Sequence, residues 1–453
     1  MEEPLVRFRK PIRNAIQLGQ HSIPRDKLFE HLMITGNPGS GKSTLIRQYI
    51  RQVEDQGQPA IIIDIEGEST TEFYKESRGD VILNPLDARC PFWSPWLELR
   101  PGSEPMDAAA LAASIVRGLV RDATQKYFQD NARALVRAMF EVIEDRDNLA
   151  SFATFLAQPR KDIREQLEKT SAAAIIDPGA HDSGGGQGII SVANTALEGF
   201  AHLPRRDQTQ RTWSAREWAQ HRKGWIFLSA KEDARAAIES LQGVWLDCLV
   251  RWLLNDESGS NQVFMFLDEL PAMGYQPNVA SLLTRGRKRQ IPCTIGFQSV
   301  SQLRSIYGHD GATTLTSCPT TQVFLRTLEP ETAKWASDSI GSHEVSRIAI
   351  SQLTGLSNYR EGLTLNPHRV VEPLVLPGEL QALEPFEGFI CCGGARTTIS
   401  IPRLHLVRRN PNFVPRLNAP AEPTTPEPEG PTDEEILAQV WARATRSPQQ
   451  PAE

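Results

Sequence analysis

The chain has 453 residues, of which 40% are hydrophobic and 23% charged, and its formal net charge at pH 7 is −6. No apolar run is long enough to span a bilayer, and the first residues, MEEPLVRFRK, carry charges where a signal peptide needs an apolar centre. The six cysteines form no C-x-x-C pair, and the nine histidines form no H-E-x-x-H motif. These features exclude a membrane-spanning chain, a disulfide-stabilised secreted domain and a zinc site, so we expect a cytoplasmic protein with reduced cysteines.

A glycine-rich segment, TGNPGSGKST, occupies Thr35–Thr44. The apolar run Leu32–Ile34 precedes it, and apolar residues recur at helical spacing after it, which predicts a strand, a loop and a helix. Its residues fit the pattern G-x-x-x-x-G-K-[ST], in which consecutive backbone N–H groups wrap a polyphosphate at the positive end of the helix. We therefore expect ATP to be bound by Gly36, Asn37, Pro38, Gly39, Ser40, Gly41, Lys42, Ser43 and Thr44.

Two residues at the end of this loop have specific predicted roles. Lys42 is expected to reach the β- and γ-phosphates, and the hydroxyl of Ser43 is expected to bind Mg²⁺, because a hard cation prefers oxygen ligands. No metal beyond Mg²⁺ is predicted.

Buried strands and helices alternate on either side of a helical segment. AIIIDI (60–65) and VILNP (81–85) are continuous apolar runs typical of buried parallel strands. From 105 to 206 the periodicity is helical, which predicts an all-α insertion; within it, SGGGQG (183–188) lacks the G-K-[ST] ending and is predicted to be a flexible connection. Strands are expected again in GWIFLSA (224–230), NQVFMFLDE (261–269), PCTIGFQS (292–299) and TTQVFLR (320–326).

The predicted fold is therefore α/β, with a mainly parallel sheet interrupted by an all-α domain. We assign residues 1–104 and 207–410 to a nucleotide-binding domain, 105–206 to the insertion and 411–453 to an acidic, Pro-rich disordered tail. Near the end of the tail, Thr432–Ala444 has the pattern of a short amphipathic helix, which either docks to a partner or packs on the body.

Two carboxylates follow the apolar strand VFMFL. In P-loop ATPases the first such acid holds Mg²⁺ and the second polarises the attacking water, so we assign these roles to Asp268 and Glu269. Gln298 follows another strand, and its amide could report whether a γ-phosphate is present. Between them, LLTRGRKRQ offers Arg285, Arg287 and Arg289 as candidates for an arginine that acts on a neighbouring subunit's phosphates.

Several segments together resemble the TraD/TrwB-type coupling proteins of bacterial conjugation. In chain order they are PRDKLFEHLMITGNPGSGKS, ILNPLDARCPFWSPW, WSAREWAQHRKGWIFLSAKED, VFMFLDELPAM, LLTRGRKRQIPCTIGFQSVSQLRSIYG and VLPGELQALEPFEGFICCGG. The similarity extends over roughly 16–407 and is far more specific than the phosphate loop alone.

The resemblance implies a RecA-like P-loop ATPase that forms a homo-hexamer and moves DNA, with its attached relaxase, to a type IV secretion channel. It matches Lys42 and Ser43 to the phosphate-loop pair, Asp268 and Glu269 to the two acids, and Gln298 to the sensor glutamine. It also favours Arg287 as the arginine that acts in trans.

Members of this family usually carry N-terminal transmembrane helices, which this sequence lacks. Either an anchor has been removed or the protein is a naturally soluble relative. The expected location is cytoplasmic, with peripheral attachment to the inner membrane as the alternative.

Two other functions are compatible with the same residues. One is a soluble FtsK/HerA-like DNA motor in DNA processing or defence. The other is a nucleotide-gated adaptor that recruits protein cargo through its helical domain and tail. A Glu269→Gln variant separates a motor from an adaptor, because it should abolish transport but not recruitment.

Overall fold

The computed structural model describes residues 15–176, 185–230, 235–256, 262–353, 362–405 and 407–416. The chain divides into two units, residues 1–415 and 416–453, and every helix and strand of the described ranges lies in the first unit. The tail segment Thr432–Ala444 lies outside the described residues. No helix in the described ranges is long and apolar enough to cross a membrane.

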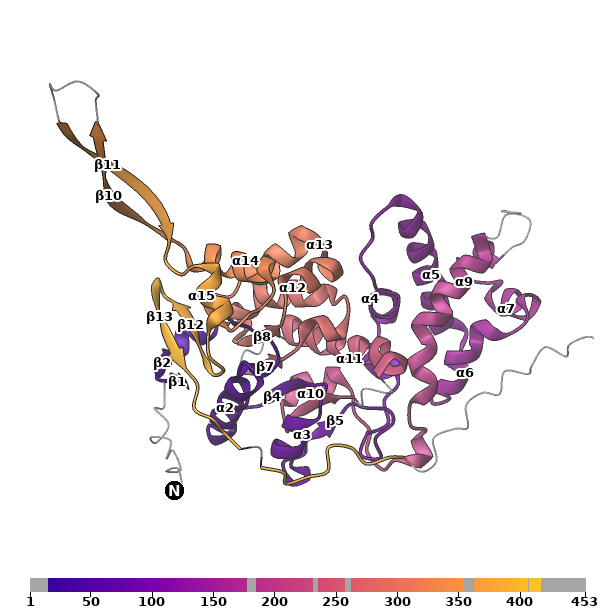
Figure 1. Ribbon diagram of the computed structural model, residues 1–453. Coiled ribbons are helices and arrows are strands. Elements are labelled where there is room, and N and C mark those ends of the chain that lie inside the picture. The colour runs from indigo at the N-terminus through magenta and orange to yellow at the C-terminus, as the bar shows by residue number, and fades with distance from the viewer. Residues whose placement is uncertain are drawn as a thin grey trace, which may run out of the picture. The chain divides into compact units, whose positions relative to one another are not determined.

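A nine-stranded sheet forms the centre of the first unit (Figure 1). Seven neighbouring strands run parallel, and two antiparallel strands extend the sheet at one edge. The prediction of a mainly parallel sheet is confirmed. In spatial order the strands are β13 (Ala395–Ser400), β12 (Glu387–Cys392), β9 (Thr321–Leu325), β3 (Leu32–Thr35), β8 (Cys293–Phe297), β7 (Phe264–Leu267), β4 (Ala60–Asp64), β6 (Ile226–Ser229) and β5 (Val81–Ile82).

Helices cover both faces of this sheet. Successive residues of a strand point to opposite faces. In β4, Ile62 accordingly packs in one apolar cluster with the helix formed by Lys42–Asp55 (α2), whereas Ile61 and Ile63 pack in another with the helices of the opposite face. The helices outside the helical segment are α1 (Arg25–Leu28), α2 (Lys42–Asp55), α3 (Glu68–Phe73), α10 (Ala215–His221), α11 (Arg235–Asn255), α12 (Pro277–Arg285), α13 (Val300–Ser317), α14 (Pro330–Ile340) and α15 (Pro377–Ala382).

Between β5 and β6 the described residues contain helices and no strand. Figure 1 shows these helices grouped together, and their buried side chains belong to the same apolar cluster as those of α11. The domain boundaries at 104 and 206 stay a prediction. The helices are α4 (Glu104–Ile115), α5 (Ala123–Val142), α6 (Leu149–Thr154), α7 (Arg160–Leu167), α8 (Ala173–Ile176) and α9 (Gly185–Leu197).

The prediction that SGGGQG is a flexible connection is wrong for its last four residues, which form the first turn of α9. A Cβ atom on Gly188 would lie 2.7 Å from the ring of Phe128 in α5. Glycine is therefore required at position 188 in spite of its low helix propensity, because close packing of α9 on α5 leaves no room there for a side chain.

Two hairpins accompany the main sheet. One consists of β1 (Ala15–Leu18) and β2 (His21–Pro24). The other, β10 (Ser342–Leu353) and β11 (Gly362–Pro373), extends away from the sheet in Figure 1 and was not predicted. Short 3₁₀ helices include η1 (Glu76–Arg78), η4 (Glu198–His202), η7 (Leu270–Met273) and η8 (Gly286–Arg289).

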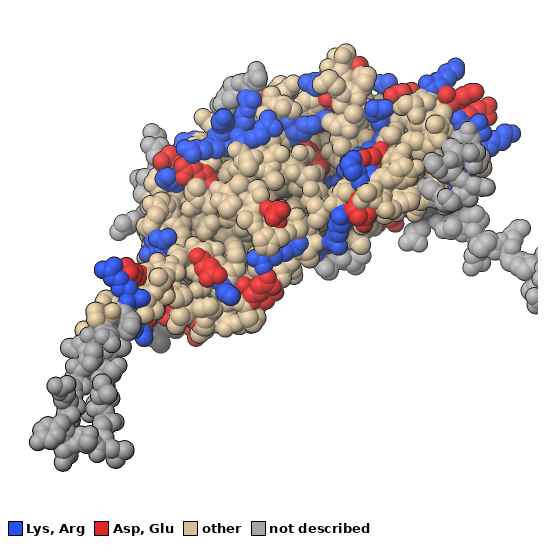
Figure 2. Space-filling model, turned by 90° about the horizontal axis from the view of Figure 1, so that it is seen from above, with Lys and Arg blue, Asp and Glu red and all other residues tan. Residues whose placement is uncertain are grey.

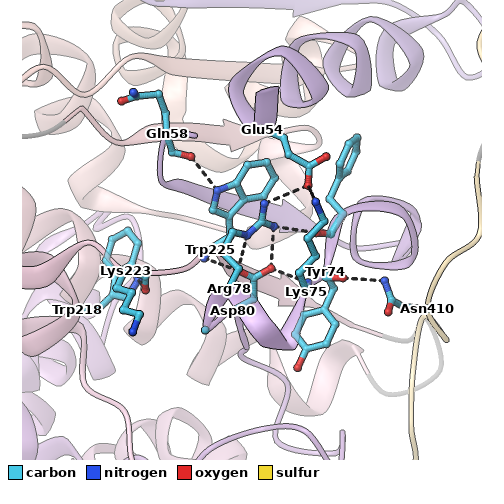
Figure 3. A network of polar contacts seen from close by, with 12 residues as sticks. Glu54, Gln58, Tyr74, Lys75, Arg78, Asp80, Trp218, Lys223, Trp225 and Asn410 are labelled. Carbon is cyan, nitrogen blue, oxygen red and sulfur yellow. Dashed lines mark hydrogen bonds and ion pairs between the residues drawn. The ribbon is translucent and has the colours of Figure 1, made fainter. Parts of the chain in front are cut away.

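A polar network fixes the edge of the sheet where β5 and β6 begin (Figure 3). The carboxylate of Asp80 is fully buried and accepts hydrogen bonds from two guanidinium nitrogens of Arg78 at 2.8 Å and from the backbone N–H groups of Lys75 and Trp225. The Arg78 guanidinium also lies 3.9 Å from the centroid of the Trp225 ring. Because this buried charge is fully paired, it ties β5 and β6 together without an unsatisfied group.

The segment after β13 is attached beside this network. The side-chain amide of Asn410 donates to the carbonyl of Tyr74 at 2.8 Å (Figure 3). The Ala88 N–H donates to the carbonyl of Val414 at 2.8 Å. Residues 409–414 therefore hold α3 against the body of the first unit.

Candidate functional site

A cavity of about 480 Å³ opens where β3, β4, β7 and β8 end. Because the carboxyl ends of parallel strands lie at one edge of a sheet, loops that are distant in sequence meet there. Seven of the nine predicted phosphate-loop residues line the cavity, and the other two, Gly36 and Ser40, are not among its lining residues. The described lining residues are Asn37, Pro38, Gly39, Gly41, Lys42, Ser43, Thr44, Arg47, Ile63, Asp64, Ile65, Glu66, Glu68, Ser69, Arg235, Asp268, Glu269, Ala272, Gln298 and Phe386.

Two glycines explain the shape of the loop. Gly41 has φ +106°, a conformation that side-chain-bearing residues rarely adopt, and it immediately precedes α2. A Cβ atom on Gly36 would lie 2.5 Å from the Ser40 hydroxyl and 2.8 Å from Cβ of Leu325 in β9, so a larger residue would force the loop or β9 to shift. The N-terminus of the 14-residue helix α2 consequently faces the cavity and favours an anion.

Lys42 is enclosed by the two predicted acids. Its Nζ atom lies 2.7 Å from Oε2 of Glu269, 3.1 Å from Oδ1 of Asp268 and 2.7 Å from the Asp268 carbonyl oxygen. Burial opposes the charge on Lys42, but the two carboxylates outweigh it and raise the pKa of the ammonium group. The lysine is therefore charged and held in place before any phosphate arrives.

Gln298 completes this group. Its Nε2 atom donates to Oε2 of Glu269 at 3.2 Å, so one carboxylate oxygen contacts both the lysine and the amide. The structure thus brings Lys42, Asp268, Glu269 and Gln298 together from the ends of three strands.

The residues predicted to hold Mg²⁺ offer a suitable set of oxygens. Oδ1 of Asp268 is buried and has no hydrogen-bond partner among the described residues, although it lies within ion-pair distance of Lys42. Ser43, which also carries an oxygen donor, lines the same cavity. A carboxylate oxygen that can still bind a cation, in the same cavity as a serine hydroxyl, suits a hard divalent cation.

Arg287 lies outside the cavity. It belongs to η8, which precedes β8 and so lies at the opposite edge of the sheet, and its side chain is 67% exposed. Its nearest charged partner is Glu30, at 3.3 Å. Of the two alternatives, Arg285 is also exposed, whereas Arg289 donates to the backbone of Asp256 at 3.0 Å. None of the three arginines lines the cavity of its own chain.

Several charged residues of the cavity were not identified from the sequence. Burial, together with the charge of Asp268, raises the pKa of Asp64 to about 6, although the Thr70 N–H donates to this carboxylate. Arg47 pairs with Glu68 at 3.3 Å. Arg235, at the start of α11, donates to the carbonyl of Ala272 at 2.6 Å.

Only Asp64 gave a signal in the sequence, because it ends the apolar run AIIID as Asp268 ends VFMFL. Arg47 and Arg235 have no distinguishing local pattern. Their presence in the cavity follows from the way α2 and α11 pack.

Residues 15–401 match the family described as the type IV secretion-system coupling protein DNA-binding domain. The chain belongs to this family. The resemblance noted from the sequence is confirmed. The coupling protein TraD of Escherichia coli (strain K12) is 25% identical over 412 residues, which cover 88% of this chain and 56% of TraD. A probable conjugal transfer protein TraG of Sinorhizobium fredii is 23% identical over 400 residues, 80% of this chain and 60% of TraG.

Solved structures of the coupling protein TrwB have the same fold. An unbound form of TrwB lacking its N-terminal segment has a TM-score of 0.78 and 26% identity, over 89% of this chain and 92% of that one. TrwB in complex with the GTP analogue GDPNP has a TM-score of 0.77 and 25% identity, over 90% and 93%. TrwB with the ATP analogue ADPNP has a TM-score of 0.76 and 25% identity, over 90% and 93%.

These comparisons confirm the predicted fold class, a P-loop nucleotide-binding fold with a mainly parallel sheet and an all-α region. The chain spans little more than half the length of the curated relatives that it matches.

The face drawn in Figure 2 carries both basic and acidic side chains. Figure 2 shows Lys and Arg side chains in groups over one face, interrupted by Asp and Glu. The residues from 419 onward carry a net charge of −5, so the rest of the chain carries −6 − (−5) = −1. The mixed distribution agrees with this near-neutral charge.

Proposed function

We propose that the chain is an ATP-driven DNA motor of conjugation that delivers DNA to a type IV secretion channel. The observation that carries this proposal is the convergence of Lys42, Asp268, Glu269 and Gln298 on a phosphate loop, in a chain of the coupling-protein family. TrwB, which has this fold, binds nucleotides, as its complexes with ADPNP and with ADP and Mg²⁺ show.

In the proposed reaction the loop amides and the N-terminus of α2 bind the phosphates of ATP. Lys42 leaves its acid partners and contacts the β- and γ-phosphates. Glu269 orients and polarises the attacking water, and Gln298, which contacts the same carboxylate oxygen, senses the γ-phosphate.

Asp268 and Ser43 would hold Mg²⁺ in this site. The ion, when bound, neutralises charge that develops on the transferred phosphoryl group.

Arg287 would act on the site of a neighbouring subunit. Since it lies at the opposite edge of the sheet from its own cavity, it can reach a phosphate only across a subunit boundary. A closed head-to-tail ring provides that boundary at every subunit, which agrees with the expected homo-hexamer.

DNA and the relaxase attached to it are the proposed cargo, and the channel at the inner membrane is the proposed partner. The chain would act in the cytoplasm, next to that membrane.

The test is ATP hydrolysis with and without DNA at several salt concentrations. We expect DNA to raise turnover at low salt, and the stimulation to fall as salt rises, because contacts to DNA phosphates are screened. Glu269→Gln should abolish turnover, whereas Asp338→Asn, an exposed acid of α14, should not. Turnover that is indifferent to DNA at low salt, in a sample shown to be hexameric, would contradict the proposal.

A further inference from the structure

Phe386, just before β12, has a backbone conformation that needs an explanation. Its φ angle is +72°, in the left-handed region that residues with bulky side chains rarely occupy. Strained residues of this kind persist where the surrounding structure enforces them, and they concentrate at ligand sites.

The main chain of Phe386 is fixed at both of its polar groups. Its N–H donates to the carbonyl of Ser40 in the phosphate loop at 2.9 Å, and its carbonyl accepts from the Ile401 N–H at 2.8 Å. Glycine would make both hydrogen bonds at this φ without strain. The backbone contacts therefore do not account for an aromatic ring at this position.

The ring lies at the nucleotide cavity. Phe386 is half-buried, lines the cavity and is the one aromatic residue among the described lining residues. Its Cδ1 atom would lie 2.9 Å from a Cβ atom on Gly41, so the ring rests against the phosphate loop where that loop has no side chain. The guanidinium of Arg403 lies 5.0 Å from the ring centroid.

The rest of the cavity suits phosphates and a cation better than a base. Its other lining side chains are charged, polar or aliphatic. A nucleobase is flat and aromatic. Where no protein group forms hydrogen bonds with the edge of the base, stacking on an aromatic ring contributes most to its binding.

We propose that Phe386 is the stacking platform for the nucleobase, with Arg403 supporting the ring through a cation–π contact. The inference rests on the proposed function, because it assigns a subsite to the same nucleotide. A phenyl ring offers no hydrogen bonds, so it accepts any purine. The site therefore selects for a triphosphate that carries a base and does not discriminate strongly between adenine and guanine.

The test uses the full chain with Mg²⁺ and compares the dissociation constants of ATP, GTP and inorganic tripolyphosphate, which has no base. Phe386→Leu keeps an apolar side chain and the same backbone strain but removes the aromatic face. We expect this variant to bind ATP and GTP about tenfold more weakly than the wild type and to bind tripolyphosphate with unchanged affinity. Phe386→Tyr should bind all three as the wild type does.

Two further variants separate stacking from folding. Phe386→Gly adopts the same φ without strain, so its loss of ATP affinity cannot come from a distorted backbone. Phe389→Leu makes the same chemical change three residues further on, at a position outside the cavity lining, and should change no affinity.

Equal affinity of the wild type and Phe386→Leu for ATP would overturn the inference. So would an equal loss of ATP and tripolyphosphate, because the ring would then only shape the phosphate loop. If the wild type bound neither ATP nor tripolyphosphate, the proposed function itself would fail.

Discussion

Oε2 of Glu269 lies 2.7 Å from Nζ of Lys42 and 3.2 Å from Nε2 of Gln298. The carboxylate of Glu269, which we propose activates the water, therefore contacts two other residues of the proposed site. One is Lys42, expected to contact the γ-phosphate, and the other is Gln298, expected to sense it. In the proposed reaction ATP takes Lys42 away from Glu269 as it binds, and the acid then becomes available to water. Binding of ATP and activation of the water would then be coupled through one carboxylate oxygen.

Neutralising Glu269 should tighten ATP binding while stopping hydrolysis. Glu269→Gln removes a charged partner of Lys42, and hydrogen bonds to charged groups are strong enough that ATP affinity should rise about tenfold. Turnover should fall by about 10² to 10⁴, the usual contribution of a general base. Calorimetric titration and a phosphate-release assay measure the two effects, with Asp338→Asn as the control. A variant that bound ATP more weakly than the wild type would refute the competition between Glu269 and ATP for Lys42.

Mixing inactive variants should restore activity if Arg287 acts in trans. Arg287→Ala and Lys42→Ala should each be inactive alone. In mixed rings, about a quarter of the boundaries combine an intact Lys42 with an intact Arg287 from the neighbour, so an equal mixture should regain about a quarter of wild-type hydrolysis. Arg285→Ala and Arg289→Ala are matched controls that should retain activity alone. No recovery in mixtures shown to exchange subunits would rule out action in trans.

His31 should make folding stability depend on pH. It is 2% exposed, its Nδ1 atom accepts the Cys293 N–H at 3.2 Å, and burial lowers its pKa from 6.5 to about 4. Between these values the unfolded chain binds a proton that the native state does not. The stabilising contribution is therefore complete above pH 6.5 and is lost as the pH falls toward 4.

Lowering the pH from 7 to 5 should cost about 2 kcal/mol of unfolding free energy through His31. His31→Asn tolerates the residue's φ of +67° and does not titrate, so urea unfolding should show a smaller difference between the two pH values. His309→Gln, at an exposed histidine of α13, should show the wild-type difference. Identical pH dependence in His31→Asn and the wild type would show that His31 is not the responsible group.

Asp80 should matter for stability and not for ATP. It lies at the edge of the sheet opposite the cavity, and its carboxylate accepts from Arg78 and from the N–H groups of Lys75 and Trp225 (Figure 3). Asp80→Asn places an amide N–H group against these donors and removes the negative charge that pairs with Arg78. We expect it to lower the free energy of unfolding by about 3 kcal/mol. Urea unfolding should show this loss while ATP affinity stays unchanged. Glu54→Gln, a more peripheral partner of Arg78 at 3.1 Å, should cost much less, and an equal cost would contradict the central role of Asp80.

Two glycines of α9 should respond to alanine in opposite ways. At Gly186 a Cβ atom meets only an ordinary contact, 3.4 Å from the Ile175 carbonyl, so alanine should stabilise the protein by up to about 1 kcal/mol. At Gly188 the same atom meets the Phe128 ring, and overpacking should destabilise it by about 1 to 3 kcal/mol. Thermal unfolding shows whether each variant is more or less stable than the wild type. A stabilising Gly188→Ala would show that α5 and α9 pack less closely than the structure has them.

Parts of the site could be predicted because each lies in a short, contiguous pattern. The phosphate loop is eight residues between a strand and a helix, and Asp268 and Gln298 each come directly after an apolar strand. Phe386 and Arg235 could not be found in this way. Phe386 reaches the loop because β12 pairs with β9 and brings a distant segment beside Ser40, which no local pattern indicates.

The sequence by itself determined that a strand, a phosphate loop and a helix follow one another, and that two acids and an amide end later strands. It could do so because backbone conformation, helix periodicity and strand burial depend on neighbouring residues. Only the tertiary structure decided the strand order, which places Lys42 against Glu269 and puts Arg287 at the far edge from its own cavity. The strand order depends on which apolar faces pack together, and these faces are up to hundreds of residues apart in the sequence. Many pairings of strands satisfy the same local pattern, but only one of them fills the core.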